Sequence, residues 1–139
     1  MVLRGMKNSR VLVSAAGYAI VGLLIISGCR QKPDFPDFDQ QAWKEDVRSC
    51  QNIRPALLPA FEKIKHQLAG LSHTQIIAVL GRPEGESLES SGQRVYYYFT
   101  EPGVHCKTNS TASSSSAAGK VAIRFDALDR VNEVIFLNP

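Results

Sequence analysis

Apolar and polar residues follow three different patterns along this chain. Residues 11–26 are almost wholly apolar, residues 40–83 place apolar side chains three and four positions apart, and residues 86–137 alternate apolar and polar positions. The second spacing is typical of amphipathic helices and the third of half-buried strands. The pattern therefore predicts an apolar N-terminal segment, followed by helices and then by a β-sheet.

The first predicted helix extends over roughly residues 40–52. Trp43, Val47 and Cys50 lie at positions i, i+4 and i+7, so we expect them on one inward face. Asp39 precedes them at the place of an N-cap, where its carboxylate can accept backbone N–H bonds. The sequence thus predicts that Cys50 points into the core beside Trp43.

Two further helices are expected in this part of the chain. Pro55 suits the first turn of one of them, because the missing N–H of a proline has no helical partner there. Its buried stripe consists of Leu57, Phe61, Ile64 and Leu68. The other helix is predicted by Ser72 and Gln75, which have capping-box spacing, and by Gly81 and Pro83, which stop it.

Three strands are expected in the C-terminal part, over residues 95–99, 121–125 and 131–137. Residues 86–89 predict only a weak strand, followed by a turn at 90–93. The last strand is expected to alternate through Val131, Glu133, Ile135 and Leu137. Helices followed by strands predict the α+β class. We therefore expect two layers, with the N-terminal helices packed on a three-stranded antiparallel β-meander.

Two segments lack any periodicity. Residues 29–40 are rich in proline and aspartate, which is typical of an extended tether, and Phe35 and Phe38 within it could dock on the domain or on a partner. Residues 108–119 are a low-complexity Ser-rich stretch that cannot build a core and should form a flexible loop. The folded domain is therefore expected to span residues 41–139 and to include this loop.

Residues 1–28 have the layout of a secretory signal peptide. Arg4, Lys7 and Arg10 form a basic start, and the apolar run that follows is shorter than the ~20 residues of a membrane-spanning helix. The alternative is an uncleaved membrane anchor.

The end of the apolar run distinguishes these two interpretations. Ile26-Ser27-Gly28-Cys29 resembles a lipobox, in which small residues precede a cysteine that receives a diacylglyceryl group. We expect cleavage between Gly28 and Cys29, lipidation of Cys29 and attachment to a membrane surface. The residue after the cysteine is Arg30 rather than aspartate, which favours the outer membrane, facing the periplasm.

Cleavage would change the charge and the size of the protein. The net charge of the whole chain is +3, but removing Arg4, Lys7 and Arg10 from its 16 basic residues leaves 13, equal to its 13 acidic residues. The mature chain would thus be neutral and, at 139 minus 28 or 111 residues, large enough for one small domain. A neutral domain provides no basic field that would predict a nucleic-acid partner.

Cys50 and Cys106 remain after lipidation of Cys29. An even number of cysteines in an exported chain predicts a disulfide, which could stabilise the fold by about 4 kcal/mol in the chain-entropy description. Two free thiols or a metal-binding pair are the alternatives.

Three motifs together resemble the SmpA/OmlA (BamE-like) family of small outer-membrane lipoproteins. They are the short helix and Gly-x-Pro stop over residues 71–83, the aromatic strand Tyr96-Tyr97-Tyr98-Phe99, and the hairpin over residues 125–131. The resemblance implies helices on a three-stranded antiparallel sheet and a protein partner in the outer-membrane assembly machinery. Asp129 replaces the usual hairpin glycine, and the cysteine pair and the Trp43 helix suggest a divergent branch.

No motif for catalysis or cofactor binding is present, and His66, His73 and His105 are scattered. We expect neutral surface histidines, no metal, no cofactor and no enzymatic activity. The resemblance to the SmpA/OmlA family implies an accessory or scaffold role in the envelope, in outer-membrane protein assembly or envelope integrity. The alternative is a periplasmic binding or inhibitor module of the β-lactamase-inhibitor type.

The aromatic strand predicts the contact surface. Val95, Tyr97 and Phe99 are the more apolar set and should face the helices, because alternation prevents one face from taking both sets. Tyr96 and Tyr98 would then lie on the open face of the sheet, with Arg124 within reach. The alternative is that the helix of Trp43 folds over this face and hides it.

Overall fold

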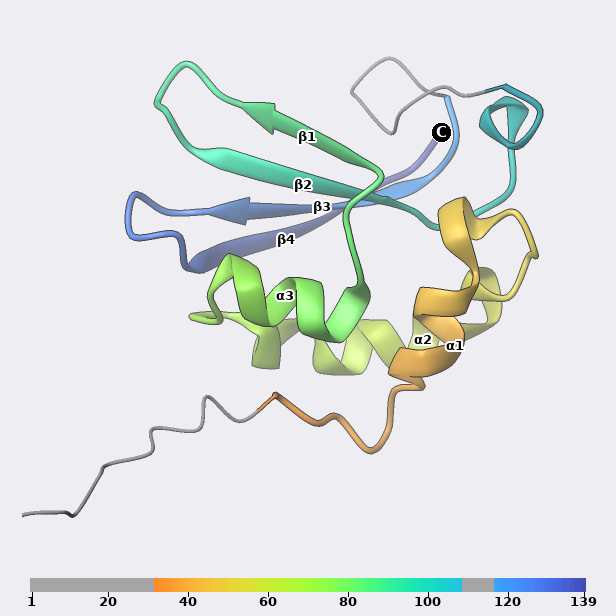
Figure 1. The fold of residues 1–139 in the computed structure, drawn as a ribbon, viewed down its shortest axis with the longest axis horizontal. Helices are drawn as coiled ribbons and strands as arrows, with labels where there is room; N and C mark the ends of the chain where they lie inside the picture. The colour runs from red at the N-terminus through yellow and green to blue at the C-terminus, as the bar shows by residue number, and fades with distance from the viewer. Residues whose placement is uncertain (1–31, 109–116) are drawn as a thin grey trace, which may run out of the picture. The chain divides into compact units, whose positions relative to one another are not determined.

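The computed structural model describes residues 32–108 and 117–139. Helices α1, α2 and α3 cover one face of an antiparallel sheet, which places the protein in the α+β class (Figure 1). None of the described helices is long and apolar enough to span a bilayer. The predicted signal peptide with Gly28 and Cys29, and residues 109–116 of the Ser-rich loop, lie outside the described residues.

Helix α1 (Gln40–Glu45) is shorter than predicted. Asp39 caps it as expected, but it ends before a single 3-10 turn, η2 (Val47–Ser49), in which Arg48 and Ser49 have φ of 60° and 57°. The chain therefore turns away from the helix axis, which leaves Val47 61% exposed. Cys50 is also exposed, so the expected inward face of Trp43, Val47 and Cys50 is wrong beyond Trp43.

The other helices agree with their predicted patterns. Helix α2 (Arg54–Ile64) continues into a 3-10 turn, η3 (Lys65–Leu68), and buries Phe61, Ile64 and Leu68. Helix α3 (His73–Leu80) has the predicted capping box, with both hydrogen bonds formed between Ser72 and Gln75. It stops at Gly81, whose φ of +83° is accessible to glycine without strain.

The sheet has four strands where the sequence analysis predicts three. Its order is β1-β2-β3-β4, with β1 (Gly85–Leu88), β2 (Arg94–Phe99), β3 (Lys120–Phe125) and β4 (Val131–Leu137). The weak segment pairs with β2 over its whole length. Its side chains alternate between half-buried and exposed, but only Leu88 of the four is apolar, so the hydropathy pattern indicates the strand only weakly.

Strand β2 has the opposite orientation from the predicted one. Tyr96 is paired with Ile123 and Tyr98 with Val121, and all four side chains belong to the buried core beneath the helices. Tyr96 and Tyr98 are therefore core residues, and the prediction that they lie on the open face is wrong. Alternation along β2 gave two apolar sets, and only pairing with β3 decides which set faces the helices.

Strand β4 contains an irregularity that the alternation did not predict. Val131 pairs with Phe125 and Glu133 with Arg124, so Asn132 is an extra residue, as in a β-bulge. Beyond it, Val134 and Phe136 pack against the core, whereas Glu133, Ile135 and Leu137 point to the other face. Val131, Glu133, Ile135 and Leu137 were expected on one face, but the bulge places Val131 towards the helices and the other three on the opposite face.

Aromatic side chains dominate the core at the α1–α2 contact. Trp43 stacks on Phe61 with ring centroids 5.1 Å apart, and Phe38 contacts both rings at 5.6 Å. Phe35 and Phe38 are 6% and 3% exposed, so the segment that we predicted as a tether belongs to the domain from Phe35 onward. Burial of two large rings outweighs the disordering effect of the neighbouring prolines and aspartates.

Candidate functional site

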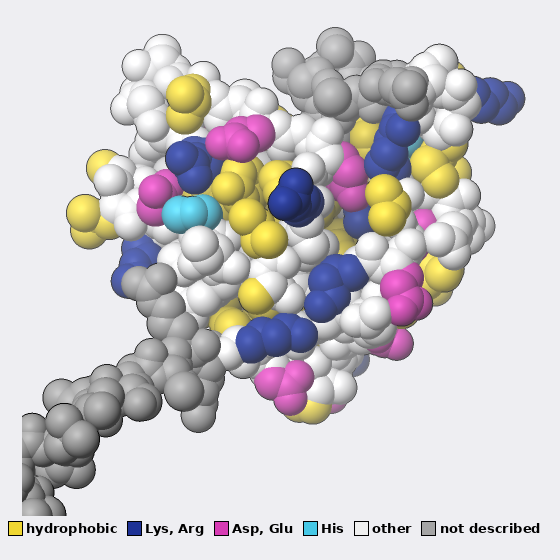
Figure 2. Space-filling view, in the orientation of Figure 1, with side chains coloured by type: hydrophobic (Ala, Val, Ile, Leu, Met, Phe, Trp, Pro, Cys, Tyr) yellow, Lys and Arg dark blue, Asp and Glu magenta, His cyan; other side chains and the backbone are white. Residues whose placement is uncertain are grey.

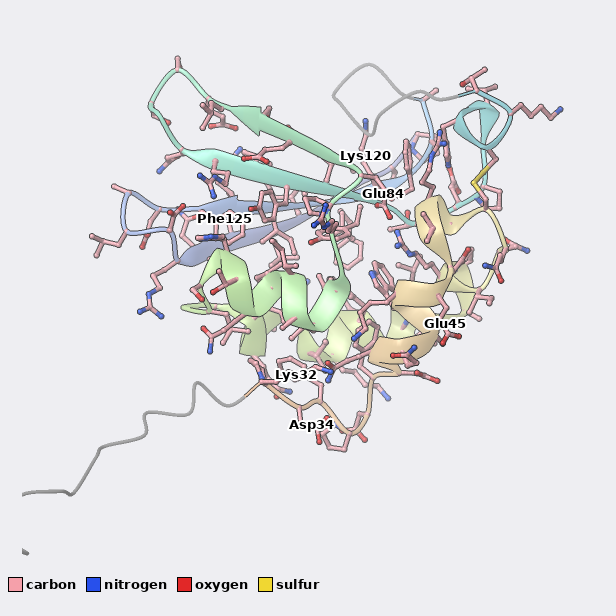
Figure 3. The ribbon with its side chains drawn as sticks, viewed as in Figure 1. Lys32, Asp34, Glu45, Glu84, Lys120 and Phe125 are labelled. Carbon is pink, nitrogen blue, oxygen red and sulfur yellow. A yellow bond between two sulfur atoms is a disulfide. The ribbon has the colours of Figure 1, made fainter. Side chains whose placement is uncertain are left out.

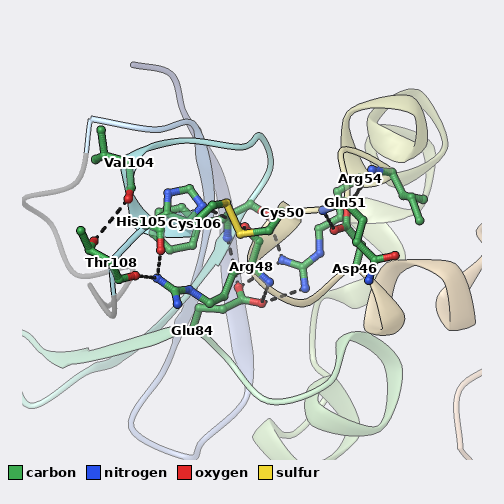
Figure 4. The surroundings of a disulfide bond; sticks show 12 residues. Asp46, Arg48, Cys50, Gln51, Arg54, Glu84, Val104, His105, Cys106 and Thr108 are labelled. Carbon is green, nitrogen blue, oxygen red and sulfur yellow. Dashed lines mark hydrogen bonds and ion pairs between the residues drawn. A yellow bond between two sulfur atoms is a disulfide. The ribbon is translucent and has the colours of Figure 1, made fainter.

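The predicted disulfide is present. Cys50 and Cys106 are bonded, with their Cα atoms 5.6 Å apart, and they join the turn after α1 to a 3-10 turn, η4 (Val104–Cys106). This bridge connects the helical layer to the connection between β2 and β3 (Figure 4). The bridge is surrounded by Asp46, Arg48, Arg54, Glu84 and His105, which we call the polar cluster.

Arg54 is the central cation of the polar cluster and is 2% exposed. Its guanidinium donates to both carboxylate oxygens of Glu84, at 3.1 and 2.8 Å, and to the carbonyls of Trp43 and Phe99, at 3.1 and 2.9 Å. The guanidinium also lies 4.7 Å from the centroid of the Trp43 ring. A buried arginine with this many partners is fixed in position and joins three elements of the fold.

Glu84 is the anion of the cluster and enters it where the chain leaves α3 for β1 (Figure 3). Besides Arg54, its carboxylate accepts from the backbone N–H of Arg48 at 3.2 Å and of Phe99 at 3.1 Å. The side chain is 8% exposed. The carboxylate therefore holds the left-handed turn at Arg48 and the end of β2 in place.

Asp46 performs the same task for α2. It is fully buried, and its carboxylate accepts from the backbone N–H groups of Gln51, Ile53 and Arg54 at 2.7 to 2.9 Å. The N–H groups of Ile53 and Arg54 are donors that the start of α2 leaves without an intrahelical partner. Asp46 is also the C-cap residue of α1, so this one side chain joins the end of α1 to the start of α2.

His105 lies between the disulfide and the sheet. It is fully buried, although the sequence analysis predicts a surface residue, and its ring stacks on Phe99 with centroids 3.5 Å apart. Nε2 lies 2.9 Å from the carbonyl oxygen of Arg48 and donates to it, while the Arg48 guanidinium donates to the carbonyls of His105 and Thr108. The side chain of each of these two residues thus donates to the main-chain carbonyl of the other.

Cys50, His105 and Cys106 place one potential metal-ligand atom each within 4.8 Å of one another. Two of the three atoms are the sulfurs of the disulfide, and only a thiolate is a metal ligand. While the disulfide is intact, these three residues join the turn after α1 to η4. The other histidines lie elsewhere: His66 is exposed, and Nδ1 of His73 is 3.6 Å from the carboxylate of Asp129.

Tyr96, Tyr98 and Arg124 do not form the predicted contact surface. The hydroxyl of Tyr98 donates to the carbonyl of Gly81 at 3.0 Å, and burial raises the pKa of this phenol well above its usual value. Arg124 lies on the opposite face of the sheet, where it pairs with Glu89 and Glu133. The tyrosines and the arginine are therefore separated by the sheet itself.

The face of the sheet opposite the helices carries other side chains, in place of the predicted tyrosines. By register these include Val95, Tyr97, Phe99, Lys120, Ala122, Arg124, Glu133, Ile135 and Leu137. The Lys120 ammonium lies 5.8 Å from the centre of the Tyr97 ring, and burial lowers the pKa of Lys120. On the helix side, cationic and anionic side chains surround apolar ones without forming a patch of one sign (Figure 2).

One hollow lies beside the sheet edge, between η3 and β4. It has a volume of about 250 Å³ and is lined by Lys65, His66, Ala69 and residues 131–134. Small-molecule sites usually enclose about 300–1,000 Å³. The hollow is therefore better matched to one or two side chains than to a cofactor.

No local pattern in the sequence predicts the polar cluster. One signal was available for Arg54: a cation at the start of a helix is unfavourable for the helix dipole, so it needs a partner from elsewhere. Nothing local identifies Glu84 as that partner, since the two residues are 30 positions apart. No family model matches this chain, and no curated protein or solved structure is significantly similar to it.

Proposed function

We propose that this protein is a cell-envelope lipoprotein, cut before Cys29, anchored by lipid on that cysteine, and acting on the periplasmic side of the outer membrane. The observation that carries the proposal is the lipobox-like sequence Ile26-Ser27-Gly28-Cys29 placed directly before a disulfide-bonded domain. Disulfides persist in exported proteins and are rare in the cytosol. The bridge and the leader thus favour the same compartment.

We further propose that the domain is a divergent member of the SmpA/OmlA type, with a non-enzymatic accessory or scaffold role in outer-membrane protein assembly or envelope integrity. The α+β arrangement and the capped helix α3 support this proposal. The ionic groups of the polar cluster also support it, because Arg54, Glu84 and Asp46 are engaged in holding elements together. Charged groups whose hydrogen bonds are all made within the protein stabilise the fold, so we assign the function to contacts made by the surface.

The lipid anchor is tested by replacing Cys29. We expect Cys29→Ala to remain at precursor mass and to lose the lipid, whereas the wild type gains the mass of the acyl groups and fractionates with outer membranes. Cys106→Ala is the matched control, since it also removes one sulfur but leaves the lipobox intact. Normal maturation of the Cys29→Ala protein would refute the proposal.

The role is tested by co-purification from native membranes. Wild-type protein extracted in mild detergent should bring down outer-membrane assembly components in stoichiometric amounts. Recovery of a soluble hydrolase in their place would favour an inhibitor module.

A further inference from the structure

Strand β4 lies at the edge of the sheet, and the register shows which of its main-chain groups point outward. The N–H of Thr100 donates to the carbonyl of Gly119 at 2.9 Å, so the main chain of Gly119 faces β2. Because these groups alternate sides along a strand, Lys120, Ala122 and Arg124 face β4. Their partners are Leu137, Ile135 and Glu133, which leaves the N–H and C=O groups of Val134 and Phe136 directed away from β3.

The beginning of β4 confirms this geometry and is itself occupied. The Val131 N–H donates to the carbonyl of Leu71 at 2.9 Å, and the Val131 carbonyl accepts from the Gly70 N–H at 2.8 Å. The edge is thus already paired with another segment of main chain at its first residue. Among the described residues no hydrogen bond continues this pairing to Val134 or Phe136.

The 250 Å³ hollow lies directly beside these unpaired groups. Val134 belongs to its wall, and Lys65, His66 and Ala69 of the adjoining helical segment form the opposite side. A strand edge next to a helix is the arrangement in which an extended peptide adds to a sheet while its alternate side chains enter a groove. Main-chain bonds then supply affinity, and the groove selects the side chain.

We propose that the β4 edge binds an extended segment of a partner polypeptide as a fifth strand, with an apolar side chain in the hollow and a carboxylate beside Lys65 and His66. The proposal deepens the proposed function, on which it rests for the view that the protein acts by contact. The ammonium of Lys65 contacts the carboxylate of Glu62 and lies 5.6 Å from the centre of the Phe136 ring. Because an exposed ion pair of this kind is weak and an ammonium has three donors, Lys65 can also bind a carboxylate of the partner.

A second copy of this chain is a poorer occupant of the same edge. Antiparallel pairing of two β4 strands about a two-fold axis perpendicular to the sheet would place both helical layers on one side. Lys65 of each copy would then approach its equivalent, and like charges in a contact are unfavourable. An acidic segment meets complementary charge.

The opposite edge provides an internal control. In β1 the Glu89 N–H donates to Gln93 at 2.9 Å, so the main chain of Leu88 points away from β2, as that of Val134 points away from β3. Strand β1 is only four residues long, and the Leu88 side chain is 71% exposed. A proline at either position removes an outward N–H without breaking a bond of the sheet.

The probe is a capped, fluorescein-labelled peptide, Thr-Val-Thr-Leu-Thr-Glu-Thr, in which Val, Leu and Glu share one face when the chain is extended. Its binding to the mature lipoprotein, purified from membranes in detergent, is measured by anisotropy. Two further peptides carry N-methyl groups on either the odd or the even residues. Since a strand pairs through one set of its amides, one methylated peptide should lose at least ten-fold in affinity while the other retains it.

Two protein variants locate the binding. Val134→Pro should weaken the probe at least ten-fold, and Ala69→Phe, which fills the hollow, at least about five-fold, whereas Leu88→Pro should leave it unchanged. Melting curves report whether each variant is folded; should Val134→Pro fail to fold, Ala69→Phe and the methylated pair still decide.

Several results would overturn the proposal. These are a dissociation constant weaker than about 1 mM for the unmodified peptide, equal behaviour of the two methylated peptides, or loss of binding in Leu88→Pro alone. A concentration-dependent dimer that excludes the peptide would assign the edge to a second copy. Lipidation of Cys29 is measured independently of peptide binding. A failure to bind the peptide would therefore not refute the lipid anchor, and a missing anchor would not refute peptide binding.

Discussion

The polar cluster and the β4 edge treat hydrogen-bonding groups in opposite ways. In the polar cluster, Arg54 and Glu84 are nearly inaccessible to water, and each finds several partners within the protein. At the β4 edge, the main chain of Val134 and Phe136 forms no bond among the described residues. Satisfied buried groups stabilise one conformation, whereas unpaired groups at a surface remain available to a partner. We therefore expect the first region to govern stability and the second to govern the binding that we propose.

The largest effect is expected from breaking the charge balance of the polar cluster. Glu84→Gln keeps the shape of the side chain but leaves the buried Arg54 guanidinium without its counter-charge, which costs about 3–5 kcal/mol. Urea denaturation followed by tryptophan fluorescence measures the change in the free energy of unfolding. Glu62→Gln, at an exposed ion pair, should change it by about 0–1 kcal/mol. Equal effects of the two would show that the cluster is not a buried unit.

The disulfide should contribute somewhat less. Its two cysteines are 56 positions apart, and replacing both with serine should lower the free energy of unfolding by about 2–4 kcal/mol, because the unfolded chain regains the entropy of that loop. The measurement compares the double variant with oxidised wild type, and wild type treated with a reductant is the control. A variant as stable as the wild type would mean that the polar cluster alone holds the junction.

Tyr98→Phe tests one buried hydrogen bond of the helix–sheet contact. Loss of the bond to Gly81 should destabilise the fold by about 1 kcal/mol at neutral pH. Tyr97→Phe, on the other face, also removes a hydrogen bond, to Ser87 at 3.2 Å, but this bond is only partly buried, so the change in stability should be less than about 0.5 kcal/mol.

The burial of Tyr98 also predicts that the stability of the protein depends on pH. Burial raises the pKa of Tyr98 in the folded protein, while in the unfolded chain it titrates near about 10. The stability that the neutral phenol contributes is therefore complete below about pH 10 and is lost as the pH rises further. The decline in melting temperature above that pH should be shallower in Tyr98→Phe, and an unchanged decline would contradict the assignment.

The smallest effect on stability is expected at the β4 edge. Ala69 is exposed, so Ala69→Phe should change the free energy of unfolding by no more than about 0.5 kcal/mol. The same variant is expected to weaken binding of the peptide probe. A variant that lost both stability and binding would show that the hollow is part of the core, and the distinction between the two regions would fail.

The order of the elements was readable from local patterns, and so were their caps. Ser72, Gln75 and Gly81 define α3 through hydrogen bonds between neighbours in sequence, and the structure forms those bonds. The disulfide was readable for another reason, since only two cysteines remain in the expected mature chain. Each of these inferences depends on information that lies within a few residues or in a simple count.

Which side chains of β2 and β4 face the helices could be decided only by the tertiary structure. Tyr96 and Val95 belong to alternate sets that are both apolar, so the period of two cannot say which set meets the helices. Pairing with Ile123 decides it for β2, and the extra residue at Asn132 changes the answer within β4. A bulge inserts one residue and has no reliable signal in composition.

The sequence by itself determined the caps of α1 and α3, the cysteine pair and the α+β class, because each depends on spacing along the chain. The leader is a prediction of the same kind. Only the tertiary structure decided that Arg54 meets Glu84, that His105 is buried against Phe99, and that the outward groups of β4 lie beside a hollow. These contacts join residues far apart in sequence. Their energies come from burial and from complementary charge in three dimensions, neither of which leaves a periodic trace in the order of the amino acids.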